Sequence, residues 1–270
     1  MAQSMYLPER TEHQKVRIVI IIILRNLMVF TKNPLIQIER LYDSNRVNAE
    51  PGQGLDLNEK LKPPAVYILN HEQFPQDSQL NRKGSSNDVN ALRKTFESLK
   101  CRVEVISNPA LPDVKNKDAG FVLFILSHGD RKEKILACDH REYHLDDDVL
   151  FPLFRNPTLS GKPKILIVQA CKGPLRADAK KMNNEPYIKC YSCSEGYLSY
   201  RNENHGSVFI QTLCEAMDQY GLTRDFQSIF KHVKAEVERR STMTGSKQVP
   251  SEESHNFDKP FYFGNYAKNT

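Results

Sequence analysis

Two residues that can carry out thiol catalysis, Cys171 and His128, each follow an apolar run of the sequence. Residues 121–126 (FVLFIL) end just before His128, and residues 164–168 (KILIV) end shortly before Cys171. A catalytic thiol needs a nearby base that generates the thiolate and later protonates the leaving amine. If both runs are neighbouring strands of a parallel sheet, their carboxyl ends place the two side chains at one edge. Gly129 after the histidine lets the backbone turn and aim N–H groups at an oxyanion.

Further apolar runs alternate with helical patterns along the chain, so the pair would lie in an α/β fold. Polar residues 75–86, with Pro75 and Gly84, are expected to form a loop. The alternation predicts a mainly parallel sheet with helices on both faces. Strands are expected at residues 65–69, 103–106, 121–126, 164–168, 187–192 and 261–263, with a hairpin strand at 134–138, and helices at residues 89–99, 145–154, 207–220 and 225–239.

The composition favours a globular protein that does not bind nucleic acid. Of 270 residues 39% are hydrophobic, enough for a substantial core, and the net charge is only +5. Six cysteines without a dense framework favour a reducing compartment, here the cytoplasm. The aliphatic run Ile18 to Leu24 is far shorter than the ~20 residues that span a bilayer, so we expect no membrane span.

Several short motifs resemble those of the caspases, in the order that this family has. They extend over roughly residues 63 to 265, which makes a chance match improbable. The motifs are Ser127-His128-Gly129 and Gln169-Ala170-Cys171-Lys172-Gly173 of the active site, Asn81-Arg82-Lys83-Gly84 of the arginine loop, Ser160-Gly161-Lys162-Pro163-Lys164, Ser199-Tyr200-Arg201-Asn202, Gly206 to Gln211, and Lys247 to Pro250.

The resemblance implies a caspase-like three-layer sandwich with a mainly parallel six-stranded sheet. It also implies an aspartate-specific cysteine endopeptidase of apoptosis or related signalling, of the short-prodomain, effector-like type, without a cofactor or metal. Cys171 would be the nucleophile, His128 its acid–base partner facing the carbonyl of Leu80, and Gly129 part of the oxyanion site. The implied substrate-binding residues are Arg82, Gln169, Arg201, Ser127, Ser199, Tyr200 and Asn202.

The resemblance divides the chain into a short N-terminal segment (1–60), a large-subunit region (61–173), a linker (174–186) and a small-subunit region (187–267). The family is made as zymogens, and Asp178 and Asp56 are the candidate processing sites. The implied partners are protein substrates with a P1 aspartate, a second caspase chain in a homodimer or heterodimer, and proteins of the inhibitor-of-apoptosis type.

One departure from the family lies between Ile106 and Phe121, where caspases carry a crossover helix. This connection has two prolines and no apolar periodicity, so one sheet face is expected to be partly bare, and the apolar segment Ile18 to Phe30 could cover it. Lys172 after the nucleophile also departs from the usual motif. These departures leave open a catalytically weak regulatory (decoy) homologue as an alternative.

A second alternative is a zinc-binding interaction module. Its ligands would be Cys190 and Cys193, spaced as Cys-x-x-Cys, with Cys138 and His140. One such pair without a second paired motif is a poor zinc signature, so we favour the protease.

Overall fold

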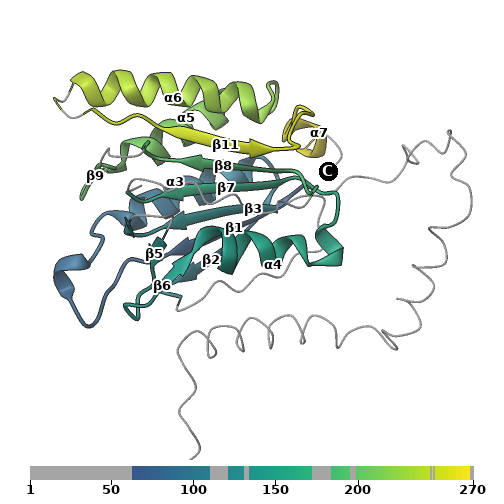
Figure 1. Ribbon diagram of the computed structural model, residues 1–270. Coiled ribbons are helices and arrows are strands. Elements are labelled where there is room, and N and C mark those ends of the chain that lie inside the picture. Colours follow the sequence, from purple (N-terminus) through teal and green to yellow (C-terminus); the bar gives the residue numbers. More distant parts are fainter. Residues whose placement is uncertain are drawn as a thin grey trace, which may run out of the picture. The chain divides into compact units, whose positions relative to one another are not determined.

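The computed structural model describes residues 63–109, 121–130, 134–171, 184–194, 199–243, 245 and 247–267. Its centre is a six-stranded sheet in the order β11-β8-β7-β3-β1-β2 (Figure 1). The strands are β1 (Ala65–Asn70), β2 (Arg102–Ser107), β3 (Phe121–Leu126), β7 (Lys164–Gln169), β8 (Tyr187–Tyr191) and β11 (Ser251–His255).

All neighbouring strands of this sheet pair in parallel except β11, which is antiparallel to β8. The inner strands β3 and β7 are buried along their whole length. Inner parallel strands are covered on both faces, which explains why these two segments are almost continuously apolar in the sequence. The predicted fold class, a mainly parallel six-stranded α/β sheet, is confirmed.

Helices cover both faces of the sheet. On one face, α3 (Ser85–Ser98), α5 (Val208–Tyr220) and α6 (Phe226–Met243) pack their apolar sides into one core with alternate strand residues. On the other face lie a π-helical turn η3 (Leu145–Leu150) and α4 (Phe151–Phe154), in front of the sheet in Figure 1. The Phe154 ring contacts the Tyr187 ring of β8 at 5.7 Å between centroids.

Smaller elements lie near the end of the sheet at which the parallel strands finish. A three-stranded sheet contains β4 (Gly129–Asp130), β5 (Lys134–Leu136) and β6 (Glu142–His144), and a short ladder joins β9 (Arg201–Asn202) to β10 (Gly206–Ser207). The remaining short helices are η1 (Ser78–Leu80), η4 (Pro157–Leu159) and α7 (Gly264–Ala267).

The expected closing strand at residues 261–263 is wrong. Phe261 and Phe263 are buried side chains that pack on the helical core, with Phe263 against Phe96 at 5.6 Å. The last strand is β11, whose polar sequence SEESH carries no apolar signal because it is an edge strand. The expected loop at 75–86 contains the short helix η1, and α3 begins within it at Ser85.

The bare sheet face expected from the missing helix does not extend to β1 and β3. Tyr67 and Leu123, which point away from the helical core, are 1% and 0% exposed. On this face of the sheet, the exposed residues of the edge strand β2 are Arg102 and Glu104. The segment Ile18 to Phe30, Asp56 and Asp178 lie outside the described residues.

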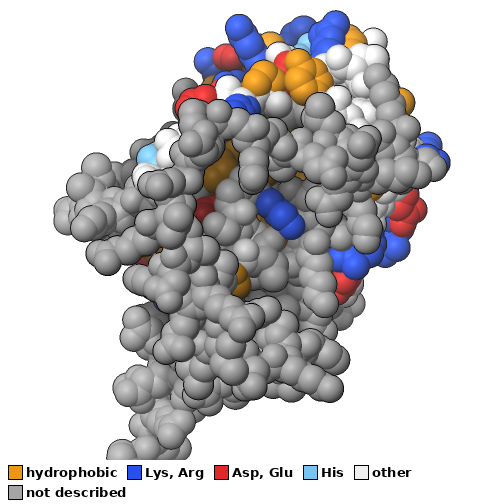
Figure 2. All heavy atoms as spheres, turned by 90° about the vertical axis from the view of Figure 1, so that its right-hand side faces the viewer, with side chains coloured by type: hydrophobic (Ala, Val, Ile, Leu, Met, Phe, Trp, Pro, Cys, Tyr) orange, Lys and Arg blue, Asp and Glu red, His pale blue; other side chains and the backbone are white. Residues whose placement is uncertain are grey.

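The surface seen in Figure 2 is mixed in charge. Among its coloured side chains, Lys and Arg lie beside acidic and apolar groups rather than forming one continuous basic area. Within the described ranges, no helix combines the length and the apolar character needed to cross a membrane.

Candidate active site

A pocket of about 270 Å³ opens at the carboxyl ends of β3 and β7. The register pairs Leu126 with Gln169, and the Ser127 N–H extends the ladder by donating to the Gln169 carbonyl at 3.2 Å. The two strand ends therefore bring His128 and Cys171 to the same pocket. Its lining residues are Arg82, Ser127, His128, Gln169, Ala170, Cys171, Ser199, Tyr200 and Arg201.

His128 is held in a fixed orientation. Its Nε2 lies 2.7 Å from the carbonyl oxygen of Leu80 in η1, and its ring packs against Phe74 at 5.3 Å. A carbonyl only accepts, so Nε2 carries the proton and Nδ1 is left for proton exchange. Burial lowers the pKa of His128, and the charges of Arg82 and Arg201 act in the same direction, although the Leu80 bond opposes them. The imidazole is thus favoured in its neutral, basic form.

Cys171 is partly exposed and lies two residues after Gln169, the last residue of β7. Gly129 allows the two strand ends to approach each other. A Cβ atom built on Gly129 would collide with the Cys171 carbonyl oxygen and lie 3.0 Å from the Ala170 side chain. Any larger residue at position 129 would therefore displace the backbone that carries the thiol.

Arg82 is fully buried, unlike the surface arginine that its polar loop would favour. Its Nη1 donates to Ser85 Oγ at 2.6 Å and to the His71 carbonyl at 3.4 Å. Among the described residues its Nε and Nη2 have no hydrogen-bond partner. Burial and the charge of Arg201 lower its pKa to about 9, so the guanidinium stays protonated at neutral pH. Two buried donors without partners are costly unless a ligand satisfies them.

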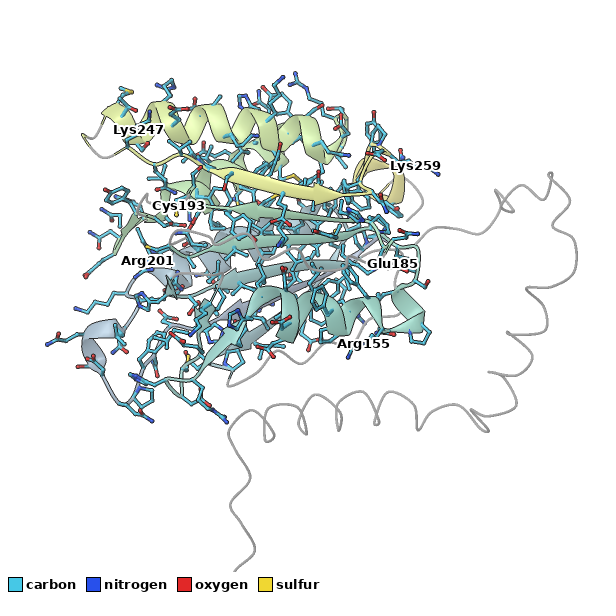
Figure 3. The ribbon with its side chains drawn as sticks, viewed as in Figure 1. Arg155, Glu185, Cys193, Arg201, Lys247 and Lys259 are labelled. Atoms are coloured by element: carbon cyan, nitrogen blue, oxygen red, sulfur yellow. The ribbon has the colours of Figure 1, made fainter. Side chains whose placement is uncertain are left out.

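Arg201, from β9, lies at the opposite end of the sheet from Glu185 (Figure 3) and is half-buried. Its Nε donates to the Lys83 carbonyl at 3.0 Å, which joins the loop of Arg82 to β9. Gly84, at φ +82°, permits this contact, since a Cβ there would lie 2.6 Å from the carbonyl oxygens of Asn202 and Glu203. The two arginine loops therefore fold against each other.

The other expected substrate-binding residues are placed as follows. Gln169 Nε2 donates to Ser199 Oγ at 2.6 Å, and Gln169 Oε1 is buried without a partner among the described residues. Ser127 donates its hydroxyl to the Leu136 carbonyl at 2.5 Å. Asn202 does not line the pocket, because its side chain accepts the N–H groups of Asn204 and His205 within its own turn.

Two residues that support the pocket were not among the site residues expected from the sequence, although Gln248 lies within the motif Lys247 to Pro250. Gln248, 0% exposed, accepts the Tyr200 N–H at 3.1 Å and donates to the Ser192 carbonyl at 2.8 Å, so it fixes the loop of Tyr200. Asp88, in the first turn of α3, is also fully buried. Asp88 lies on the same face of α3 as Leu92 and Phe96, and an acid within an apolar helical stripe is the sequence signal that could have identified it.

The zinc-binding alternative is contradicted. Among the described residues, no group of three or more His, Cys, Asp or Glu side chains is placed to hold a metal ion. Cys190 and Cys193 are both fully buried. The thiol of Cys138 contacts His71 Nδ1 at 3.6 Å rather than joining those cysteines.

Comparisons with known proteins agree with this geometry. The family described as "Caspase domain" matches residues 65–262. Caspase-6 of Gallus gallus is 28% identical over 254 residues, covering 76% of this chain and 82% of the relative. Caspase-3 of Bos taurus is 30% identical over 241 residues, covering 74% and 86%. Caspase-3 of Mus musculus is 28% identical over 253 residues, covering 79% and 89%.

Proposed function

This chain belongs to the caspase family, and from that premise we propose that it is a cysteine endopeptidase that cuts proteins after aspartate, in apoptosis or related signalling. Cys171 is the nucleophile and His128 the acid–base partner, and both line the pocket at the sheet end. The family also dimerises in general, so we propose a homodimer or a heterodimer with another caspase chain.

One observation carries the proposed specificity: Arg82 holds two buried donors that no described residue satisfies. Arg201 adds a second guanidinium to the same pocket. A substrate carboxylate would accept from the planar guanidinium donors, and it would replace their missing partners. A neutral side chain would leave them unpaired, which is how a buried polar site rejects analogues that lack the matching group.

The proposed reaction follows from the orientation of His128. The Cys171 thiol loses its proton to the imidazole, and its sulfur attacks the backbone carbonyl carbon of the aspartate itself. The protonated imidazole then donates to the departing amine, and a thioester remains on Cys171. A water molecule, deprotonated by the neutral imidazole, attacks the thioester and releases the acid. The Gly129 and Cys171 backbone N–H groups are the proposed donors to the oxyanion.

The test compares tetrapeptide substrates that differ only in the last residue before the cut, aspartate or asparagine. We expect kcat/KM to be at least about 1,000-fold higher for aspartate. Arg82→Met should remove most of this preference, whereas the matched exposed variant Arg93→Met should keep it. Equal rates on the two substrates would refute the aspartate specificity. No cleavage of either, by protein that has been processed, would favour the regulatory homologue.

A further inference from the structure

The two pocket arginines share a buried counter-charge that the proposed reaction does not use. Asp88 is 0% exposed in the first turn of α3. The Ser207 N–H donates to its Oδ1 at 2.8 Å and the Gln211 side chain donates to the same oxygen at 2.9 Å. Its other oxygen, Oδ2, has no hydrogen-bond partner among the described residues.

The backbone links Asp88 to each arginine through one residue. On one side, Arg82 donates to Ser85, which lies one helical turn before Asp88 in α3. On the other side, Ser207 donates to Asp88 and is the cross-strand partner of Arg201 in the β9–β10 ladder. Gly206 fits between them, since a Cβ there would collide with Asp88 Oδ1. Asp88 therefore lies between the segment that carries Arg82 and the segment that carries Arg201.

The negative charge of Asp88 acts on both pocket arginines, as its position between them leads one to expect. Asp88 raises the pKa of Arg201 and of Arg82 against the effect of burial, which lowers both. Burial raises the pKa of Asp88 itself, while its hydrogen bonds and the charge of Arg82 oppose that shift. The acids Glu72 and Glu203 also act on the arginines, but Glu203 is exposed and Glu72 partly exposed, so water screens them more than the fully buried Asp88.

We propose that Asp88 is the resident counter-ion of the two-arginine pocket, and that it sets how strongly the pocket attracts an anionic side chain. It touches no substrate and acts through Arg82 and Arg201, so it is a positioning residue. Without an anion in the pocket, the negative charge of Asp88 offsets the electrostatic repulsion between the two neighbouring guanidinium groups. When a substrate carboxylate enters, it interacts with the same guanidinium charges. Asp88 and the substrate carboxylate therefore compete for the same two positive charges. The inference rests on the proposed function, which supplies the aspartate substrate.

Asp88→Asn isolates the charge. Both hydrogen bonds go to Oδ1, which asparagine also offers as an acceptor, so both can persist while the charge is lost and an NH2 group replaces Oδ2. In a Cys171→Ala background, binding of peptides ending in aspartate or asparagine is measured by fluorescence anisotropy. We expect Asp88→Asn to raise the ratio of aspartate to asparagine affinity about tenfold. The ratio cancels any general loss of binding.

A second measurement needs no peptide. The melting temperature of the full chain is followed while inorganic sulfate is added, with sodium chloride at matched ionic strength as the reference. Asp88→Asn should melt lower than the wild type in chloride, and sulfate should recover more of its stability than it adds to the wild type. Gln211→Met removes a hydrogen bond from Asp88 but keeps the charge, so it should melt lower without a larger sulfate response.

An unchanged or smaller affinity ratio in Asp88→Asn, or a sulfate response equal to that of Gln211→Met, would overturn the counter-ion role. If the parent protein does not distinguish the two peptides, the proposed specificity fails, and the sulfate measurement alone still decides the role of Asp88.

Discussion

At the residue scale, the sequence allowed His128 and Cys171 to be placed at one pocket, but it did not give their surroundings. His128 and Cys171 follow apolar runs that are adjacent strands, so a simple rule about parallel sheets brought them together. The complete burial of Arg82 could not be predicted, because it depends on β9, more than a hundred residues later in the chain, folding against the Arg82 loop. Asp88 was missed for the same reason, since its partners Ser207 and Gln211 lie more than a hundred residues away.

The first prediction concerns the catalytic pair. Cys171→Ala and His128→Ala should each lower kcat by about 1,000-fold or more, and the double variant should lose little beyond either single one. Residues that act as one unit are not additive. Steady-state kinetics on an aspartyl peptide checks this, with melting temperatures to show that the variants fold. Additive losses in the double variant would contradict a shared role.

The second prediction concerns His71, which is fully buried and contacts Tyr143 and Cys138. Burial, with the charge of Arg82, lowers the pKa of His71 to about 3. Between pH 6.5 and pH 3 the unfolded chain therefore binds a proton that the folded protein does not. Stability must fall as pH falls through this window, by on the order of 5 kcal/mol from this group alone.

Urea unfolding at pH 7, 5 and 4 measures this loss. His71→Gln should unfold more readily at pH 7 but should lose less stability on acidification than the wild type. The exposed His205→Gln serves as the control and should follow the wild type. Parallel pH profiles for wild type and His71→Gln would show that His71 is not the titrating group.

At the element scale, the strands and helices with clear periodicity were predicted, and those defined by pairing alone were not. The buried strands β3 and β7 have continuous apolar sequences, and α5 and α6 have apolar faces. The edge strand β11 is polar, and the run 261–263 owes its apolar character to packing on the helices instead. Apolar content reports burial, and it reports a strand only where the segment also has a backbone hydrogen-bonding partner.

The third prediction tests the contact between the ends of β3 and β7. Gly129→Ala should lower kcat/KM about 100-fold, because the added Cβ must displace the Cys171 backbone from its position beside His128. Gly161→Asn is the matched control: Gly161 has φ +68° with open space around it, and asparagine tolerates that conformation. Kinetics and melting temperatures of both variants check this. Wild-type activity in Gly129→Ala would show that the strand ends adjust without cost.

At the scale of the whole molecule, the sheet combines strands from both sides of the segment 174–186. Strands β1, β2, β3 and β7 precede this segment, and β8 and β11 follow it. Buried Lys164 at the start of β7 pairs with Glu185, just before β8, at 2.7 Å. The central ladder between β7 and β8 therefore joins the two regions without help from the covalent connection.

The proposed cut after Asp178 gives the fourth prediction. Mass spectrometry of the self-processed protein should find a new amino terminus at Ala179, and Asp178→Ala should block that cut. The two fragments should stay together on size exclusion under native conditions, because the β7–β8 ladder and the Lys164–Glu185 pair hold them. Normal processing of Asp178→Ala would place the cut elsewhere.

Cutting that segment also changes the molecularity of unfolding. An intact chain unfolds in a unimolecular reaction, whereas a nicked one separates into two polypeptides whose re-encounter depends on their concentration. The ladder between β7 and β8 then becomes a protein–protein interface. A site for a foreign protease, inserted between residues 174 and 186, would show this with or without self-processing. After the cut, the melting temperature should rise with protein concentration more steeply than that of the uncut protein. The stability of the cut protein would then depend on how much of it is present.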